Sequence, residues 1–220
     1  MKQFLRRVGH YPTLLANGLL MHKTLLMLKS VGIVIEPYHF YQEGLFRPAP
    51  PADLADFEFV ELGVESQPAL ARIVAIPPTR EDLKTRFAEG QICFALKRGD
   101  RIAAFTWCQT ADLSFGPFRR LLERHEAYLY GAETLYEFRG HRLQPYLRYK
   151  AYEALYAGGR HLLYSYCDYF NYPAIRFKEK LGARTLFTGL HLGLFGLWSK
   201  NWTLKKGAEA AEIPPPGSGG

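Results

Sequence analysis

The residues best suited to chemistry lie in the stretch FRGHRLQ, where Arg139, Gly140, His141 and Arg142 make up a basic turn. A strand-like run precedes this turn, and a basic, aromatic-rich run with helical spacing follows it. The first N–H groups of a helix have no partners within the helix and lie at the positive end of its dipole, so a phosphate can bind them. The stretch therefore predicts an anion-binding turn, and the alternative is an ordinary helix start.

A second group of polar residues begins at Asn171, in the sequence NYPAIRFKEKLGA. The asparagine side chain is expected to cap a helix of residues 173–181, because its oxygen can accept a hydrogen bond from a free N–H of the first turn. Gly182 is expected to end this helix, because glycine readily adopts the left-handed conformation of a C-terminal cap. The segment therefore predicts a short helix, one strand after the turn.

Together, the two segments make residues 138–183 resemble the acetyl-CoA-binding half of the Gcn5-related N-acetyltransferase (GNAT) superfamily. In that family an Arg/Gln-x-x-Gly-x-Gly/Ala turn follows the fourth strand, and an Asn-x-x-Ala-x-x-Phe-Tyr-Glu-Lys-Leu-Gly-like helix comes after the next strand. Arg139 and Gly140 match the first motif, whereas Arg142 and Gln144 stand where small residues are usual. The second motif is matched by Asn171, Ala174, Phe177, Glu179, Lys180, Leu181 and Gly182.

The resemblance implies an acyl-CoA co-substrate, either acetyl-CoA or a longer acyl-CoA, and no metal. Backbone N–H groups at the end of the fourth strand, here Thr134, Leu135 and Tyr136, would polarise the thioester carbonyl. Asn171 and Ala174 would lie near the pantetheine arm. The turn residues that would surround the pyrophosphate are Arg139, Gly140, His141, Arg142, Leu143 and Gln144.

Glu133 is the candidate general base, acting directly or through a water molecule. Acyl transfer requires the neutral amine, and the two-residue repeat of a strand aims Glu133, Leu135 and Glu137 to the same side. The alternative for Glu133 is an ordinary exposed or paired carboxylate. Glu126, at the other end of the strand, is the second choice.

Lys178 is the clearest departure from the family pattern, because it replaces the tyrosine that often protonates the departing thiolate. We weigh Lys178 as a catalytic residue against a solvated helix position. Tyr172 is the candidate phenol in place of that tyrosine, with Tyr164, Tyr166 and Tyr169 as neighbouring alternatives. The thiolate could also leave without a dedicated acid.

The elements that must position these residues follow from hydrophobic spacing and turn signals. Their order is strand, helix, three strands, helix, strand, helix and final strands, which predicts an α/β (α+β) fold. As in the GNAT family, we expect a central mixed, mostly antiparallel sheet flanked by helices. The expected strands are 57–63, 92–97, 101–110, 126–135, 161–169 and those that begin at residue 184, and the expected helices are 79–89, 142–157 and 173–181.

The chain of 220 residues is long enough for one main domain. The proline-rich stretch RPAPPAD divides a basic, apolar N-terminal extension, residues 1–50, from a GNAT-like acyltransferase domain, residues 51–206. Residues 207–220 are expected to be a disordered tail. The extension contains an apolar helix of residues 14–28, which packs on the domain, lies in a membrane interface or spans the membrane.

Charge and cysteine content narrow the choice of partners. A net charge of +7 and a pI near 9.3 favour an anionic partner. Nucleic acid is not expected, because the basic and aromatic residues follow no nucleic-acid-binding motif. The three cysteines lack metal-like spacing, which argues against a disulfide framework or a zinc site and favours the cytoplasm.

These observations predict an acyl-CoA-dependent N-acyltransferase, and more narrowly an N-acetyltransferase, in the cytoplasm. The basic, apolar ends of the chain predict a peripheral membrane enzyme at the inner face of an anionic membrane surface. Its acceptor would be an amine-bearing small molecule or a lipid-linked amine. The alternative is a catalytically degenerate GNAT-fold binding or scaffold protein, whose turn has lost its glycines.

Overall fold

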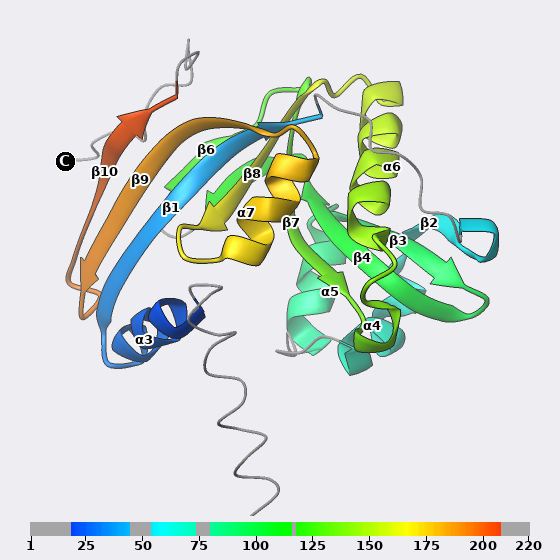
Figure 1. Cartoon of the computed structure of the whole chain (residues 1–220), viewed down its shortest axis with the longest axis horizontal. Coiled ribbons are helices and arrows are strands. Elements are labelled where there is room, and N and C mark those ends of the chain that lie inside the picture. Colours follow the sequence, from blue (N-terminus) through cyan, green and yellow to red (C-terminus); the bar gives the residue numbers. More distant parts are fainter. Residues whose placement is uncertain (1–18, 45–53, 74–79, 116–117, 208–220) are drawn as a thin grey trace, which may run out of the picture.

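The computed structural model describes residues 19–44, 54–73, 80–115 and 118–207, and its main feature is one eight-stranded sheet (Figure 1). The strands are β1 (Ile33–Glu43), β2 (Glu58–Leu62), β3 (Ile92–Arg98), β4 (Arg101–Gln109), β7 (Glu126–Thr134), β8 (Leu162–Asp168), β9 (Arg184–Leu194) and β10 (Trp198–Lys206). Their order is β10-β9-β1-β8-β7-β4-β3-β2. Neighbouring strands are antiparallel except β7 and β8, which are parallel. The expected mixed, mostly antiparallel sheet is confirmed.

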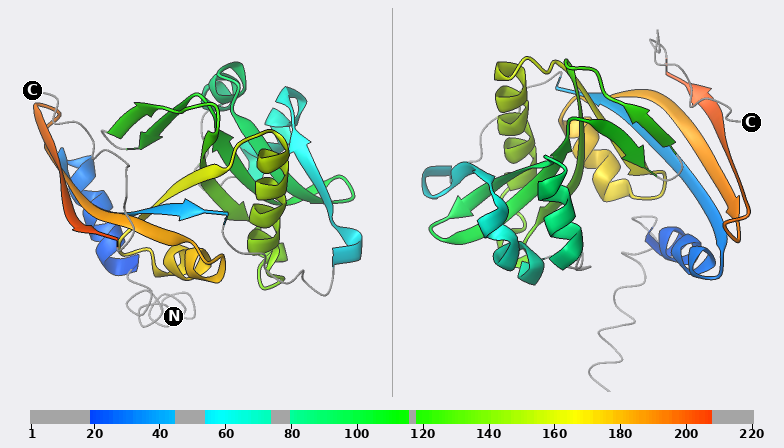
Figure 2. Two further views of the ribbon diagram at one scale, coloured as in Figure 1. Left: turned by 90° about the horizontal axis from the view of Figure 1, so that it is seen from above. Right: turned by 180° about the vertical axis from the view of Figure 1, so that it is seen from behind.

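Helices cover the sheet on both faces (Figure 2). One face carries α6 (Leu143–Ala157) and α7 (Tyr172–Lys180), and α3 (Leu19–Ser30) packs against β1. The other face carries α4 (Gln67–Ile73), α5 (Arg80–Ala88) and a hairpin of β5 (Asp112–Phe115) and β6 (Phe118–Leu121). Short 3-10 turns are η1 (Leu54–Asp56), η2 (Val64–Ser66) and η3 (Tyr136–Phe138).

Strand β3 shows why both faces are covered. Phe94 and Leu96 belong to the cluster under α6, whereas Cys93 and Ala95 belong to the cluster under α4 and α5. Successive side chains of a strand point to opposite faces, so a strand that is apolar at every position must be buried on both sides.

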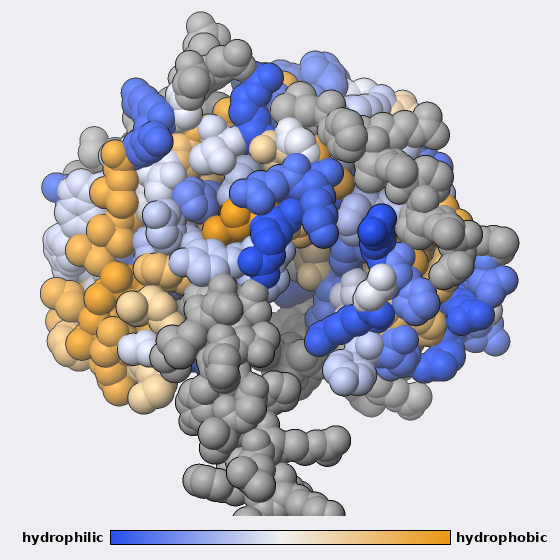
Figure 3. Space-filling model, in the orientation of Figure 1, coloured by the Kyte–Doolittle hydropathy of each residue, from blue (hydrophilic) through white to orange (hydrophobic). Residues whose placement is uncertain are grey.

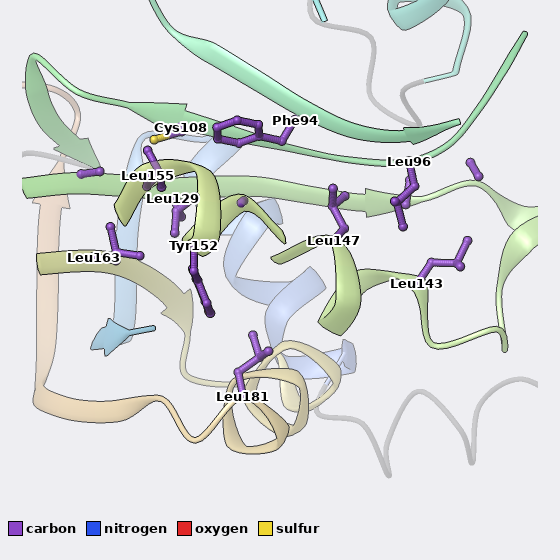
Figure 4. Close-up of a cluster of buried hydrophobic side chains, with 14 of the residues drawn as sticks. Phe94, Leu96, Cys108, Leu129, Leu143, Leu147, Tyr152, Leu155, Leu163 and Leu181 are labelled. Carbon is purple, nitrogen blue, oxygen red and sulfur yellow. The ribbon is translucent and has the colours of Figure 1, made fainter. Parts of the chain in front are cut away.

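Helix α6 presents a continuous apolar stripe to the sheet (Figure 4). Because 3.6 residues complete a helical turn, side chains four positions apart lie on one face. Those of α6 are buried among residues of β3, β4, β7 and β8. The stripe consists of Leu143, Leu147, Ala151 and Leu155. Their burial fixes the start of α6, which follows the predicted anion-binding turn.

Strand β1 comes from the segment that the sequence analysis assigned to an N-terminal extension. It lies between β8 and β9 and pairs with both, so the sheet continues across the predicted boundary at residue 50. Strand β1 contains Pro37, although proline cannot donate a hydrogen bond to a ladder. The pairing of β1 with β8 ends at Tyr38 with Asp168, and Pro37 lies one residue beyond this pair. At Pro37, β1 is therefore paired with β9 alone.

The predicted apolar helix begins, in the part of the chain that the structure describes, at Leu19, and it ends at Ser30. Residues 14–18, the stretch RPAPPAD and the tail from residue 208 lie outside the described residues. Among the described helices, none has the length and apolar character that crossing a membrane requires.

Candidate active site

A cleft opens where the two parallel strands separate. Strands β7 and β8 pair only from Glu126 with Leu162 to Leu129 with Ser165. Beyond these pairs, β7 continues beside β4 and β8 beside β1, so the strands diverge toward their C-terminal ends (Figure 1). The resulting cleft has a volume of about 590 Å³. Its walls are Tyr128, Leu129, Tyr130, Gly131, Ala132, Gln144, Arg148, Tyr166, Cys167, Asp168, Asn171, Pro173, Ala174, Phe177 and Lys178.

A β-bulge on β7 forms one edge of the cleft. Glu133 pairs with Phe105 and Tyr130 with Trp107, so Gly131 and Ala132 together face the single residue between those two on β4. Gly131 has a φ of +59°, and a Cβ atom there would lie 3.1 Å from Cδ1 of Trp107. This position therefore favours glycine. A bulge takes an extra residue out of the ladder, so backbone groups at the cleft edge are available for a ligand.

The bulge differs from the predicted site of carbonyl polarisation at Thr134, Leu135 and Tyr136, none of which lines the cleft. Thr134 pairs with Ala104 in the ladder, and the N–H of Leu135 donates to the Ala103 carbonyl at 3.0 Å. Tyr136 is 82% exposed. A glycine inside a strand pattern is the sequence signal that would have identified Gly131.

The predicted anion-binding turn follows β7 and η3 and leads into α6, whose second residue, Gln144, lines the cleft, whereas residues 139–143 do not. Gly140 has a φ of +90°, and Arg142, the N-cap of α6, adopts the left-handed conformation with φ 55° and ψ 27°. Arg142 thus adopts a backbone conformation that glycine takes without strain. Its side chain makes no cap hydrogen bond, which leaves the first N–H groups of α6 without a side-chain cap.

The side chains of the turn divide between solvent and the interior. Those of Arg139, His141 and Arg142 are exposed, and Arg139 Nε donates to the Thr134 carbonyl at 3.3 Å. Leu143 is buried in the core beneath α6. Gln144 points inward: its Nε2 donates to the Phe105 carbonyl at 3.1 Å and to the Glu133 carbonyl. The exposed arginines Arg139 and Arg142 therefore flank the helix start, while Gln144 joins β4 to β7 behind the bulge.

Helix α7 supplies the opposite wall of the cleft. Asn171 caps it as predicted, since its Oδ1 accepts a hydrogen bond from the Ala174 N–H at 3.3 Å. Gly182, with a φ of +62°, ends it as predicted. Asn171, Ala174 and Lys178 all line the cleft, whereas Tyr172, which is 37% exposed, does not.

Lys178 belongs to a buried charge cluster with Glu43 of β1 and Arg148 of α6. The structure corrects the solvated alternative, because Lys178 is only 4% exposed. Its Nζ donates to Glu43 Oε1 and, at 2.6 Å, to Ser165 Oγ. Glu43 Oε2 accepts a hydrogen bond from the Tyr152 hydroxyl at 2.5 Å and lies 3.5 Å from Arg148 Nε. The cluster therefore joins β1, β8, α6 and α7 beside the cleft.

Burial and charge shift the pKa values of this cluster. Burial lowers the pKa of Lys178 to about 8, although the nearby Glu43 carboxylate opposes the change. Burial alone would raise the pKa of Glu43, but Arg148 and Lys178 outweigh it and lower the pKa to about 2. Glu43 is thus a stable anion and a poor base, while Lys178 has a pKa suited to proton donation.

The predicted bases lie away from the cleft walls. The Glu133 side chain is half-buried, and Glu126 is held by Arg120 at 2.6 and 2.9 Å, so Glu126 stabilises the start of β7.

Asp168 contributes a carboxylate to the cleft wall and accepts a hydrogen bond from the Tyr166 hydroxyl. Cys167 is buried, and burial raises the pKa of its thiol to about 12, which keeps it protonated. Among the described residues, no group of three or more histidine, cysteine or acidic side chains could hold a metal ion.

Sequence reasoning missed Gly131, Glu43, Arg148 and Asp168. Arg148 has a local signal, because it is a charged residue one position after Leu147, at the edge of the apolar stripe of α6. Glu43 has none, because its partner Lys178 lies 135 residues away in the chain.

Comparison with solved structures identifies the fold. A GNAT-family protein from Novosphingobium aromaticivorans superposes with a TM-score of 0.51 at 22% identity, over 74% of this chain and 65% of that chain. A GNAT-family acetyltransferase from Colwellia psychrerythraea gives a TM-score of 0.56 at 14% identity, over 74% of this chain and 58% of that chain. A Gcn5-related N-acetyltransferase from Sphaerobacter thermophilus gives a TM-score of 0.54 at 12% identity, over 84% of this chain and 57% of that chain. No protein-family model and no curated protein matches the sequence.

The chain therefore has the GNAT fold, as residues 138–183 predicted. It spans 57% to 65% of the length of these three structures. At these identities the comparison establishes the fold alone.

Proposed function

We propose that the protein is an acyl-CoA-dependent N-acyltransferase, with acetyl-CoA or a longer acyl-CoA as co-substrate and an amine as acceptor. The observation that carries the proposal is the cleft between β7 and β8, which opens beside an uncapped, basic helix start. Coenzyme A has a pyrophosphate and a long, narrow pantetheine arm, and it needs two neighbouring sites of this kind. The GNAT fold supports the same class of reaction.

In this proposal the coenzyme lies along the cleft from its open end to its closed end. The pyrophosphate binds the N–H groups at the start of α6 and the side chains of Arg139 and Arg142. The pantetheine arm runs between the bulge and α7, past Asn171 and Ala174. The thioester then lies near the closed end, beside Leu129 and Ser165, the last residue pair of β7 with β8.

The reaction requires one bond to form and one to break. The nitrogen of the neutral amine attacks the thioester carbon, a C–N bond forms, and the C–S bond breaks. Backbone groups of the bulge at Gly131 and Ala132 would stabilise the carbonyl oxygen as it gains charge. Lys178 would give its proton to the departing thiolate, and Asp168 would take the proton from the amine, directly or through water; Glu133 remains the predicted alternative base.

Thermal stability against a series of ligands tests the proposal. Ligand at a hundred times its dissociation constant should add about 2.7 kcal/mol, which corresponds to several degrees at this chain length. We expect CoA and acyl-CoA to stabilise the protein more than ATP does, and Arg139→Glu to weaken that effect. Equal shifts with CoA and ATP, or no shift, would instead favour a degenerate binding or scaffold protein.

Turnover is followed by the release of CoA thiol in the presence of a panel of amines. Asp168→Asn and Glu133→Gln then compare the two candidate bases. Loss of rate in only one of them identifies the base, and an unchanged rate in both would refute the two assignments.

A second feature favours action at a membrane surface. Apolar side chains of α3 and of the turn between β9 and β10 form an exposed surface, which we call the apolar patch (Figure 3). The two segments meet where the Phe195 N–H donates to the Gly32 carbonyl at 2.6 Å. The patch consists of Met27, Val31, Leu194, Phe195, Leu197 and Trp198, and Leu197 is 90% exposed.

We propose that the apolar patch enters the interface of an anionic membrane, with Lys23, Lys29 and Lys200 beside it. The acceptor would then be a lipid-linked or amphipathic amine at the cytoplasmic face, where the buried free thiols of this chain would stay reduced. Co-sedimentation with vesicles tests this. We expect binding to anionic vesicles at low salt and its loss in Phe195→Asp/Leu197→Asp, and equal recovery of both proteins in the supernatant would refute it.

A further inference from the structure

Arg148 is a buried cation without a full set of partners. It is 1% exposed and lines the cleft. Its guanidinium lies 5.7 Å from the centre of the Phe177 ring, and its Nε lies 3.5 Å from Glu43 Oε2, too far for a well-formed hydrogen bond. Both Nε and Nη1 are buried and have no hydrogen-bond acceptor among the described residues. Leaving charged donors unpaired in the interior is costly.

Glu43 does not satisfy Arg148, because other groups already bond to both of its oxygens. Oε1 accepts from Lys178, and Oε2 accepts from the Tyr152 hydroxyl at 2.5 Å. The cluster contains two cations, Arg148 and Lys178, and one anion, Glu43, and therefore carries one excess positive charge. Each of these side chains is less than a tenth exposed, so solvent cannot compensate the excess. Asp168, which lines the cleft, accepts a hydrogen bond from the Tyr166 hydroxyl.

We infer that the closed end of the cleft binds a carboxylate at the end of the acyl group, so that the co-substrate is the CoA thioester of a short dicarboxylic acid. This inference rests on the proposed function. A carboxylate beside Arg148 would neutralise the excess charge and could accept two parallel hydrogen bonds from the guanidinium.

The geometry favours the acyl group over the other parts of the coenzyme. The uncapped helix start lies at the open end of the cleft, which is where the phosphates would bind. Lys178, the other cation of the cluster, bonds to Ser165, in the last residue pair of β7 with β8 and so at the closed end. A coenzyme that begins at the turn reaches this end with its thioester and acyl group. The excess charge therefore faces the acyl group.

Pairs of CoA thioesters with the same shape and different charge test the inference. Malonyl-CoA matches isovaleryl-CoA, and succinyl-CoA matches 4-methylpentanoyl-CoA, because in each pair an isopropyl group of similar shape replaces the carboxylate. We expect calorimetry on the full chain to give at least one carboxylate thioester a dissociation constant about 10- to 100-fold lower than that of its neutral match, as for a hydrogen bond to a charged group. Free CoA is the reference, and ATP is the anion control.

Variants of Arg148 decide whether this side chain is responsible. Arg148→Met keeps the length of the side chain without its charge and should remove the preference while CoA still binds. Arg148→Lys keeps the charge and should retain part of the preference, and thermal melts check that both variants fold.

Three results would overturn the inference. Equal affinity for every thioester and for free CoA would support the coenzyme site but refute the specificity for a carboxylate. A loss of affinity in Arg148→Met that is equal for CoA and all thioesters would mean that Arg148 contacts the shared part of the coenzyme. Absence of any CoA binding would refute the proposed function itself.

Discussion

Replacing Glu43 with glutamine removes the anion from the buried cluster and leaves Arg148 and Lys178 facing each other. Glutamine keeps the size of the side chain, so the change tests charge and not packing. Removing one partner of a buried ion pair costs about 3–5 kcal/mol. The pKa of Glu43, lowered to about 2 from 4.5, corresponds to a similar figure of about 3 kcal/mol. We therefore expect the melting temperature to fall by about 6–20 °C at neutral pH.

The pH dependence of the melting temperature gives the same prediction an independent check. Because the pKa of Glu43 is lower in the folded state, its contribution to stability is present above about pH 4.5 and is lost as the pH falls toward 2. The difference in melting temperature between wild type and Glu43→Gln should therefore shrink as the pH falls from 7 to 3. Both proteins are followed by circular dichroism across this range.

Glu137→Gln is the matched control, because Glu137 forms an exposed ion pair with Arg101. Such a pair contributes only about 0–1 kcal/mol. Adding Lys178→Met to Glu43→Gln removes one uncompensated cation and should recover part of the lost stability. The reasoning would be refuted if Glu43→Gln melted within about 2 °C of wild type, which corresponds to less than 1 kcal/mol. It would also be refuted if the difference in melting temperature did not change with pH.

Three further changes test the cleft and its turn. Gly131→Ala should lower the free energy of unfolding by about 1–2 kcal/mol, because alanine is strained at a φ of +59° and its Cβ would meet Trp107. It should also weaken acyl-CoA binding. An unchanged melting temperature would contradict the bulge. Arg142→Gly should stabilise the protein by about 0.5–1 kcal/mol, because release of left-handed strain outweighs the entropy of glycine; a lower melting temperature would contradict this. Lys178→Met should lower turnover by about 10²- to 10⁴-fold, and wild-type turnover should fall above about pH 8 as Lys178 loses its proton; equal rates in both proteins would exclude Lys178 as the acid.

The anion-binding turn shows how much of the candidate site could be predicted from local sequence. Arg139 and Gly140 matched the family motif, and the helix start follows them as expected. Arg142 departs from that motif, because it stands where a small residue is usual. In the structure Arg142 adopts the left-handed conformation, because packing of the α6 stripe fixes where the helix begins.

Cap residues and hydrophobic spacing determined most elements of the α6 and α7 half of the fold. Asn171 caps α7 and Gly182 ends it, because both act on backbone groups within a few residues of themselves. The hairpin of β3 and β4 was predictable for the same reason. Strand β1 was not, because nothing within residues 33–43 specifies that their partners are β8 and β9, more than a hundred residues later.

The sequence by itself determined the fold class, the basic turn and the capped helix, since each depends on interactions between near neighbours in the chain. Only the tertiary structure decided that the cleft edge is the bulge at Gly131 and that Lys178 is buried beside Glu43 and Arg148. The physical reason is that burial and ion pairing depend on what long-range strand pairing brings together. A lysine on a helix is solvated or buried according to its partners, and here the partner comes from a strand at the opposite end of the chain.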